Sequence, residues 1–427
     1  MPPTFLNDDP LFDFNLLRPL SLSVYDGSDI GEVLMAARNI IPGDFESFSS
    51  AFLQLANKVC NRAASIVKSD FPFSARTALF SAATYFRSAD FFLHGNSTDV
   101  RVVDYWHRQT DAFDQAISLL NPPGKRLTIR TPDFDVPATW YTPAGQHARQ
   151  LPTIIMGNGY DGSQEELYHV IGAAAIERGY NVLTYEGPGQ PAVIRQQGLG
   201  FIPDWERVVT PVMDYVLQHM DNVDPDSVGL LGLSFGGYLA PRAAAFDHRF
   251  AAVIALDGVW DFGATTRSGF GTEMLKLHAS GNRQEFDKRA RSAFLRPGTP
   301  THLRWGLEQG LWAFRTQSPF DLVVQAANYT LEHVAHLIKT PTFIGDAQRD
   351  LFFGGQPRRL AEALGSWGHL HEFKVADGTG MHSGIGALKQ QSQVVLDWFQ
   401  HVVDERQDTR RRHFYGVSVN GKSIRDL

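Results

Sequence analysis

The 427-residue sequence predicts an α/β fold in which helices cover both faces of a mostly parallel sheet. From about Lys125 to Leu256, short apolar runs alternate with helical patterns, and the alternation resumes at Pro341. Earlier, from about Phe45 to Leu120, apolar residues recur at helical spacing without a strand pattern. The expected units are a helical N-terminal domain at 1–124, an α/β core at 125–262 and 338–404, a helical cap at 263–337 and a C-terminal tail at 405–427.

The N-terminal domain is predicted from its helical periodicity. Apolar residues stand three or four positions apart, as in Phe52, Ala56 and Val59. Its many aromatic residues are expected in a core, with some of them roofing a pocket. The Asn121-Pro122-Pro123-Gly124 segment ends the helical region, because proline and glycine both interrupt helices.

The α/β core is expected to begin with an antiparallel pair of strands at 126–130 and 136–141. A buried strand at 151–156 follows and leads into a glycine-rich loop at 157–162. Ligands and catalytic groups in open α/β sheets gather at the carboxyl ends of the strands. We therefore expect the chemistry in the loops that follow the strands.

One of these strands ends in the pentapeptide Gly232-Leu233-Ser234-Phe235-Gly236, between apolar Val228–Leu231 and an alanine-rich helical segment. Glycines two positions before and after a serine permit a sharp strand-to-helix turn that exposes the hydroxyl. The pentapeptide alone would favour a glycine turn with an incidental serine. Its strand and helix flanks favour a nucleophile at Ser234.

A nucleophilic serine requires a base, and His382 fits this role best. It follows a strand predicted at 371–375 and lies in a glycine-rich loop. His369 and His371 are expected before that strand, at the wrong end of the sheet, and His401 in the terminal amphipathic helix. His382 is therefore the predicted base.

The acid that orients the base is expected at Asp350. A buried strand is predicted at 341–347, and Asp350 lies just past its end. Asp346 is the rival, but it falls within the strand. The chain order Ser234, Asp350, His382 is the order of a triad built on such a sheet.

Two backbone amides must stabilise the oxyanion, one from the residue after the nucleophile and one from the loop after an earlier strand. Phe235 supplies the first. In the 157–162 loop, Tyr160 is expected to supply the second, with Gly159 as the alternative.

The same loop matches a dinucleotide-binding pattern, Gly157-x-Gly159-x-x-Gly162. A strand precedes it, a helical segment follows, and Glu186 ends the next strand, where a ribose-binding acid would lie. A dinucleotide-binding protein is therefore an outside alternative. Two observations count against it: the strand is not the first of its sheet, and a Rossmann fold leaves Ser234, Asp350 and His382 unexplained.

The cap is expected to exclude water and to shape the substrate pocket. Near its start, Trp260 and Phe262 either wall the pocket or pack the cap. Asp257 and Asp261 are candidates for polarising the substrate. The favoured interpretation is that these two residues are a helix cap and a surface carboxylate. Asp257, Trp260 and Phe262 are the predicted substrate-binding residues.

Composition and charge exclude several function classes. A formal net charge of −7 gives no electrostatic footprint for nucleic acid, and Arg410-Arg411-Arg412 is expected in a solvated tail. Cys60 is the only cysteine, which excludes an intrachain disulfide and a cysteine-rich metal site and indicates a reducing compartment. No signal-peptide pattern and no apolar run near ~18 residues are found. We expect a cytoplasmic protein without cofactor, metal, nucleic-acid or membrane partner; its oligomeric state stays open, a homodimer included.

The motifs resemble those of the α/β-hydrolases, and in particular the branch of 2,6-dihydroxypseudooxynicotine hydrolase and the fungal polyketide-shortening hydrolases. The resemblance spans most of the chain up to about residue 404. It rests on the helical N-terminal extension, the 159–166 loop, Glu186-Gly187-Pro188-Gly189-Gln190, the Ser234 elbow, and the Asp350 and His382 loops. Asp346 is a departure, since relatives often have histidine there.

The resemblance implies cleavage of a carbon–carbon bond in an acylated aromatic or polyketide-like small molecule. The triad alone implies only acyl transfer. A carboxylesterase or lactonase, and a biosynthetic cyclase or acyltransferase, would use the same residues and remain alternatives.

Overall fold

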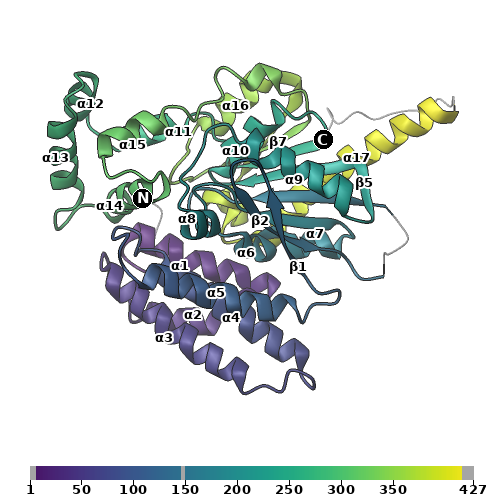
Figure 1. The fold of residues 1–427 in the computed structure, drawn as a ribbon, viewed down its shortest axis with the longest axis horizontal. Coiled ribbons are helices and arrows are strands. Elements are labelled where there is room, and N and C mark those ends of the chain that lie inside the picture. Colours follow the sequence, from purple (N-terminus) through teal and green to yellow (C-terminus); the bar gives the residue numbers. More distant parts are fainter. Residues whose placement is uncertain (1–5, 146–149, 416–427) are drawn as a thin grey trace.

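The computed structural model describes residues 6–145 and 150–415, with side chains described up to residue 409. A central sheet with its helices forms the core, a bundle of helices packs against one side of it, and a second helical group extends from one end (Figure 1). Arg410-Arg411-Arg412 and the end of the predicted tail lie outside the described side chains. Among the described residues, no helix is both long and apolar enough to cross a membrane.

The described part of the chain forms an eight-stranded sheet in the order β1-β2-β4-β3-β5-β6-β7-β8. The β1–β2 and β2–β4 pairs are antiparallel, and the remaining neighbours are parallel. This confirms the predicted mostly parallel α/β sheet with a leading antiparallel pair. The strands are β1 Lys125–Arg130, β2 Asp135–Tyr141, β3 Leu151–Gly157, β4 Asn181–Tyr185, β5 Val223–Leu233, β6 Ala252–Leu256, β7 Thr342–Ala347 and β8 Gly368–Phe373.

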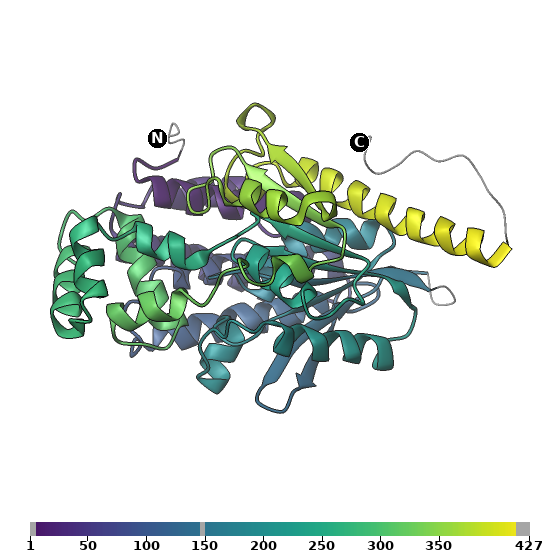
Figure 2. The same cartoon turned by 90° about the horizontal axis from the view of Figure 1, so that it is seen from above.

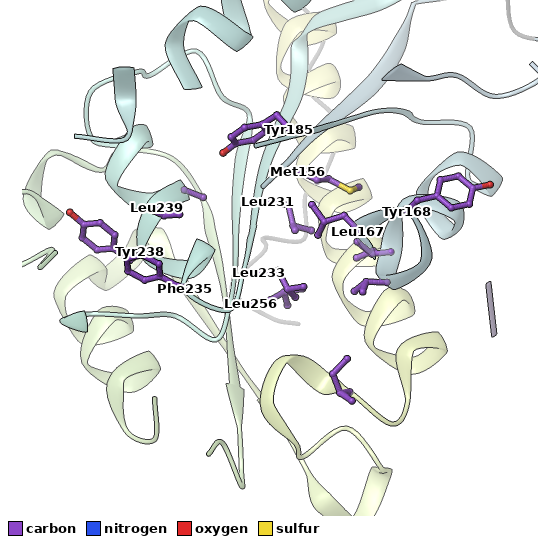
Figure 3. Close-up of a cluster of buried hydrophobic side chains, with 14 of the residues drawn as sticks. Met156, Leu167, Tyr168, Tyr185, Leu231, Leu233, Phe235, Tyr238, Leu239 and Leu256 are labelled. Atoms are coloured by element: carbon purple, nitrogen blue, oxygen red, sulfur yellow. The ribbon is translucent and has the colours of Figure 1, made fainter. Parts of the chain in front are cut away.

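The central strands carry apolar side chains on both faces, because helices cover both faces of the sheet. Ile154 and Ile155 on β3 and Leu230 on β5 are completely buried. Figure 3 shows Phe235 and Leu239 on one side of the strands, and Met156, Leu231 and Leu167 on the other. This two-sided packing explains why the strands read as continuous apolar runs in the sequence.

Helices α9 and α10 pack on one face of the sheet, and α6, α7 and α17 on the other. A single π-helical turn, Tyr168–Gly172, joins α6 to α7. Helix α17 runs to Tyr415, so residues 405–415, assigned to the tail from sequence, continue this helix. The core helices are α6 Gln164–Leu167, α7 Ala173–Glu177, α8 Pro191–Gln197, α9 Glu206–His219, α10 Gly236–Ala244, α16 Gln356–Leu364 and α17 Leu388–Tyr415.

The N-terminal helices form a unit with an aromatic interior beside the core (Figure 1). The first helix is capped by Asp9, whose carboxylate accepts hydrogen bonds from two N–H groups of its first turn. Inside the unit the Phe92 ring stacks on Phe45 at 4.6 Å and contacts Phe12 at 4.9 Å. The helices are α1 Pro10–Leu22, α2 Ile30–Ala37, α3 Phe45–Ala64, α4 Pro72–Asp90 and α5 Arg101–Ile117.

The cap helices lie between β6 and β7 and extend beyond the carboxyl ends of the strands. Figure 2 shows them at the end of the molecule opposite the last turns of α17. Phe270 lies 5.2 Å from Phe286 and 5.0 Å from Phe294 (ring centroids), which gives the cap a small aromatic core of its own. The helices are α11 Phe262–Ser268, α12 Thr272–Ala279, α13 Arg283–Phe294, α14 Thr301–Ala313 and α15 Pro319–Ala326.

Candidate active site

Ser234 lies on a sharp turn between β5 and α10. Its φ of 60° is in the left-handed region, which is strained for a residue other than glycine and is typical of functional turns. A Cβ on Gly232 would lie 1.9 Å from the Gly236 carbonyl oxygen, so only glycine permits this turn. The hydroxyl therefore projects beyond the carboxyl end of the sheet.

His382 is positioned by the short helical turn His382–Gly384, which follows β8. Its Nε2 lies 2.9 Å from Ser234 Oγ, and its Nδ1 lies 3.0 and 3.1 Å from the two carboxylate oxygens of Asp350. The Asp350 carboxylate also accepts backbone hydrogen bonds from Phe352 and Phe353, at 2.7 and 3.0 Å. The structure thus brings together the three residues singled out from sequence in a serine–histidine–aspartate relay.

The rival residues lie elsewhere. Asp346, on β7, forms an ion pair of 2.8 Å with Arg358. His369 and His371 lie inside β8, against the Phe343 ring, and not before the strand as expected from sequence. His401 is exposed on α17.

Asp257 is a second carboxylate beside the base. Its Oδ2 lies 3.3 Å from His382 Nδ1, and its side chain is 2 % exposed. It accepts hydrogen bonds from Ser383, from the backbone N–H at 2.9 Å and from the hydroxyl at 2.5 Å. Asp257 is not among the residues that line the cavity, where substrate contact was predicted for it. Its left-handed backbone, with φ of 64°, turns the carboxylate behind His382.

The two carboxylates and the imidazole shift one another's protonation. Burial alone would lower the pKa of His382, but the charges of Asp257 and Asp350 outweigh it and raise that pKa to about 9. Burial raises the pKa of Asp257 to about 7. Burial also opposes ionisation of Asp350, yet His382 and its hydrogen bond hold the pKa of Asp350 below its usual value. Asp350 is therefore the charged partner of the base.

Among the described residues, Asp257, Asp350 and His382 are also the one group of three side chains whose atoms could ligate a metal ion.

Two backbone amides near the Ser234 turn are the candidate donors to an oxyanion. Within the described residues, neither the Phe235 N–H nor the Tyr160 N–H donates to a protein group, whereas the Gly159 N–H donates to Asn158 Oδ1 at 2.8 Å. A Cβ on Gly159 would lie 2.6 Å from the Phe235 nitrogen, which shows how closely this loop approaches the elbow. The geometry favours Tyr160 over Gly159 as the second donor.

Two arginines of the N-terminal unit hold the 157–162 loop, which carries Tyr160 and is called the oxyanion loop below. Arg18 on α1 lies 2.6 Å from Asp161 and 2.5 Å from Glu166, and Arg87 on α4 lies 3.0 Å from Asp161. Although burial opposes it, these cations keep the pKa values of Asp161 and Glu166 below their usual range. The arginines were not identified from sequence, because no local motif marks them.

A second contact joins the loop to the cap. Gln309 on α14 donates to the Tyr160 carbonyl oxygen at 3.1 Å, and its own carbonyl oxygen lies 2.6 Å from His94 Nδ1. His94 in turn pairs with Asp90 at 3.1 Å. The oxyanion loop is therefore held from both the N-terminal unit and the cap.

A cavity of about 220 Å³ opens above Ser234 and His382. Its walls come from α1, the oxyanion loop and the cap, and Phe262 is among them. Trp260 is not, since its ring lies beneath the Arg359 guanidinium at 5.0 Å. Asp261 caps α11 by accepting from the Ala264 N–H.

The dinucleotide interpretation of the glycine loop is not supported. Both carboxylate oxygens of Glu186 accept backbone hydrogen bonds, from Gln164 at 2.7 Å and Ala192 at 2.6 Å. Its side chain is buried, and burial raises its pKa to about 8. The loop itself packs against the Ser234 turn, and Glu186, the acid expected at a ribose, is already bound to two backbone N–H groups.

Comparisons with known proteins agree with this geometry. A model of the prolyl oligopeptidase family matches residues 208–300, which include the Ser234 turn. The chain is 30% identical over 419 residues to Hydrolase LUC6 from Fusarium sp, covering 93% of this chain and 97% of that protein. The chain belongs to the α/β-hydrolases. Like its relatives, it is a hydrolase.

Further matches place this hydrolase within the superfamily. It is 30% identical to 20-hydroxy-prefusarin hydrolase FUS2 from Gibberella moniliformis, covering 93% of this chain and 97% of that protein. The crystal structure of 2,6-dihydroxy-pseudo-oxynicotine hydrolase matches with a TM-score of 0.69 and 21% identity, over 90% of this chain and 95% of that one. The fungal relatives thus agree with the branch indicated by the motifs, and the solved structure agrees in fold.

Proposed function

We propose that Ser234 is the nucleophile of a hydrolase that cleaves a carbon–carbon bond next to a carbonyl group in an aromatic or polyketide-like small molecule. His382 accepts the Ser234 proton during attack, and Asp350 holds the imidazole in the required tautomer. The amides of Phe235 and Tyr160 stabilise the oxyanion. The observation that carries the proposal is the Ser234–His382–Asp350 triad, with distances of 2.9 and 3.0 Å, at the floor of a cavity.

In carbon–carbon cleavage the leaving group is a carbanion, which His382 protonates as it departs. Such a fragment leaves only when its charge is delocalised, so the substrate is an enolisable 1,3-dicarbonyl or an acyl group on an electron-rich ring. The predominantly apolar cavity between α1 and the cap suits a molecule of this kind. Water then hydrolyses the acyl-enzyme, with His382 as the base.

The proposal is tested by comparing an aryl 1,3-diketone, a matched aryl ester and a lactone as substrates. We expect the diketone to give the highest kcat/KM of the three, and p-nitrophenyl acetate, tested beside them, to be a poor substrate. Ser234→Ala should abolish turnover of every compound while the fold is retained. Rapid hydrolysis of p-nitrophenyl acetate with indifference to the diketone would identify a carboxylesterase or lactonase.

Reaction in ¹⁸O-labelled water separates hydrolysis from cyclisation or acyl transfer. Hydrolysis of an acyl-enzyme places one solvent oxygen in the carboxylic acid product. A product without solvent oxygen would instead identify a cyclase or acyltransferase that uses the same triad.

A further inference from the structure

The Tyr160 N–H belongs to the peptide unit between Gly159 and Tyr160, so the orientation of this unit decides where the oxyanion donor points. In a trans peptide the C=O and the N–H point in opposite directions. The Gly159 carbonyl oxygen accepts a hydrogen bond of 3.2 Å from Nε2 of Gln190. The Tyr160 N–H therefore points away from Gln190, and no protein group among the described residues accepts it.

Gln190 is itself fixed in the orientation that this contact requires. Its side chain is buried at the start of α8. Its Oε1 accepts from the Gly187 N–H at 2.8 Å, which turns Nε2 toward the oxyanion loop, where it also donates to the Asn158 carbonyl oxygen at 2.6 Å. The glutamine that ends the 186–190 segment thus holds two successive carbonyl groups of the oxyanion loop.

Helix α14 of the cap holds Tyr160 from another side. Gln309 is 1 % exposed, and its Nε2 donates to the Tyr160 carbonyl oxygen at 3.1 Å. The Tyr160 hydroxyl donates to the Gly306 carbonyl oxygen at 3.4 Å. A Cβ on Gly310 would lie 2.8 Å from the Tyr160 hydroxyl oxygen, which shows how closely α14 approaches this side chain. The helix therefore contacts both the main chain and the side chain of Tyr160.

The Gln309 amide is oriented by His94. The His94 Nδ1 lies 2.6 Å from Gln309 Oε1, an atom that only accepts, so Nδ1 carries the hydrogen. The imidazole stacks on Trp312 at 4.1 Å, and its Nε2 lies 3.1 Å from both Asp90 Oδ2 and Arg195 Nη2. These contacts fix the imidazole and, through it, the amide that binds the oxyanion loop.

Neither glutamine lines the cavity above Ser234, so each acts on the reaction only through the loop that it holds. Donors that are oriented in advance stabilise an oxyanion best, because they do not reorganise during the reaction. Resting on the proposed function, we infer that Gln190 and Gln309 are positioning residues of the oxyanion hole. Gln190 sets the direction of the Tyr160 N–H, and Gln309 holds Tyr160 in place from the cap.

The test compares the binding of trifluoroacetophenone with that of acetophenone. Ser234 Oγ adds to the activated carbonyl carbon of trifluoroacetophenone, the serine proton passes to His382 Nε2, and the carbonyl oxygen becomes an oxyanion. Acetophenone binds without forming this adduct and reports on the cavity alone. Calorimetry gives both dissociation constants, and the ¹⁹F NMR signal identifies the adduct.

We expect Gln190→Met to raise the dissociation constant of trifluoroacetophenone about 30-fold and Gln309→Met about tenfold, with that of acetophenone changed less than about threefold. His94→Phe keeps an aromatic ring but loses the donor to Gln309. It should raise the trifluoroacetophenone constant about fivefold by itself and no further when combined with Gln309→Met, because both changes act through one amide.

Gln197→Met is the matched control for Gln190→Met. Gln197 also lies on α8, and its amide also bonds two backbone groups, the N–H and the carbonyl oxygen of Asp135, at 2.9 and 2.8 Å. Because these bonds do not reach the oxyanion loop, Gln197→Met should leave both dissociation constants unchanged.

Circular dichroism checks the fold of each variant, and if Gln190→Met does not fold, Gln309→Met and His94→Phe decide. Equal losses of affinity for the two ketones, no loss for trifluoroacetophenone, or the same loss in the control would overturn the inference and leave Ser234 as the nucleophile. If Ser234→Ala binds trifluoroacetophenone as tightly as the wild type, no adduct forms on Ser234. The proposed function then fails, and the inference fails with it.

Discussion

The N-terminal unit and the cap both enclose the active site, but they contact it with different chemistry. The N-terminal unit reaches the oxyanion loop through buried charges, with the Arg18 and Arg87 side chains only 10 % and 11 % exposed. The cap contributes mainly aromatic and aliphatic walls, and its own ion pairs, such as Arg283–Asp321, lie at the surface. The comparison indicates that the N-terminal unit supports the chemistry and the cap mainly sets which substrate enters.

Buried and exposed ion pairs differ in how much they contribute to stability. Removing one partner of a buried ion pair leaves an uncompensated charge and costs about 3–5 kcal/mol, whereas an exposed pair contributes about 0–1 kcal/mol. Substitutions at the loop contacts should therefore change kcat and stability. Substitutions in the apolar wall of the cap should change KM and leave kcat nearly unchanged.

The largest loss of activity is expected from a substitution in the α/β core, which carries the catalytic residues, and not from one in the N-terminal unit or the cap. Asp350→Asn should lower kcat/KM about 10⁴-fold, because the imidazole loses the carboxylate that fixes its tautomer. Asp346→Asn should lower it less than about tenfold, since Asp346 pairs with Arg358 and not with the base. Steady-state kinetics at pH 8 with circular dichroism as the folding check decides this, and a larger loss at Asp346 would reverse the assignment.

The next effect tests the N-terminal unit. Arg18→Met should lower kcat about 100-fold, because the loop that carries the Tyr160 donor is released, and should lower the free energy of unfolding by about 3–5 kcal/mol. Arg18→Lys should restore stability more than kcat, since one ammonium cannot bridge Asp161 and Glu166 as the guanidinium does.

Arg283→Met in the cap is the matched control for Arg18→Met. It should change stability by less than about 1 kcal/mol and leave kcat unchanged. Denaturant unfolding and kinetics on the same samples provide both readouts. Equal effects of the two arginine substitutions would remove the distinction between the N-terminal unit and the cap.

A smaller effect is expected from the cap wall. Phe270→Leu should raise KM for a bulky aryl diketone about tenfold and change kcat less than about threefold, because Phe270 lines the cavity away from the reacting atoms. Slow turnover of p-nitrophenyl acetate should not change. Phe246→Leu, at an exposed phenylalanine, is the control. A fall in kcat as large as that of Arg18→Met would assign the cap a direct role in the chemistry.

The smallest effect concerns Asp257. Its carboxylate raises the pKa of His382, and the base must be neutral to accept the Ser234 proton. Asp257→Asn should therefore move the acid limb of the kcat/KM profile to lower pH by about one unit, with kcat/KM at pH 9 within about threefold of wild type. Asp261→Asn, at the cap of α11, should leave the limb in place. A shift to higher pH would contradict the electrostatic role of Asp257.

The fold and the relay could be predicted because their signals are local. The glycines around Ser234, the strand before Asp350 and the glycine-rich loop of His382 each define a short element with one geometry. Arg18 could not be found in this way, since it lies 143 residues before Asp161 in the chain. The orientation of the Asp257 side chain could not be predicted either. The left-handed backbone at Asp257 turns its carboxylate toward His382 and away from the cavity, and the sequence does not show this conformation.

The central claim is that Ser234 is the nucleophile, and covalent labelling tests it most directly. An aryl-free fluorophosphonate should add one phosphonyl group to the intact protein, peptide mapping should place it on Ser234, and Ser234→Ala should not react. Ser383 is the informative rival, because it also lines the cavity but donates its hydroxyl hydrogen to Asp257. Labelling of Ser383 or of another serine, or labelling of Ser234→Ala at the wild-type rate, would contradict the account.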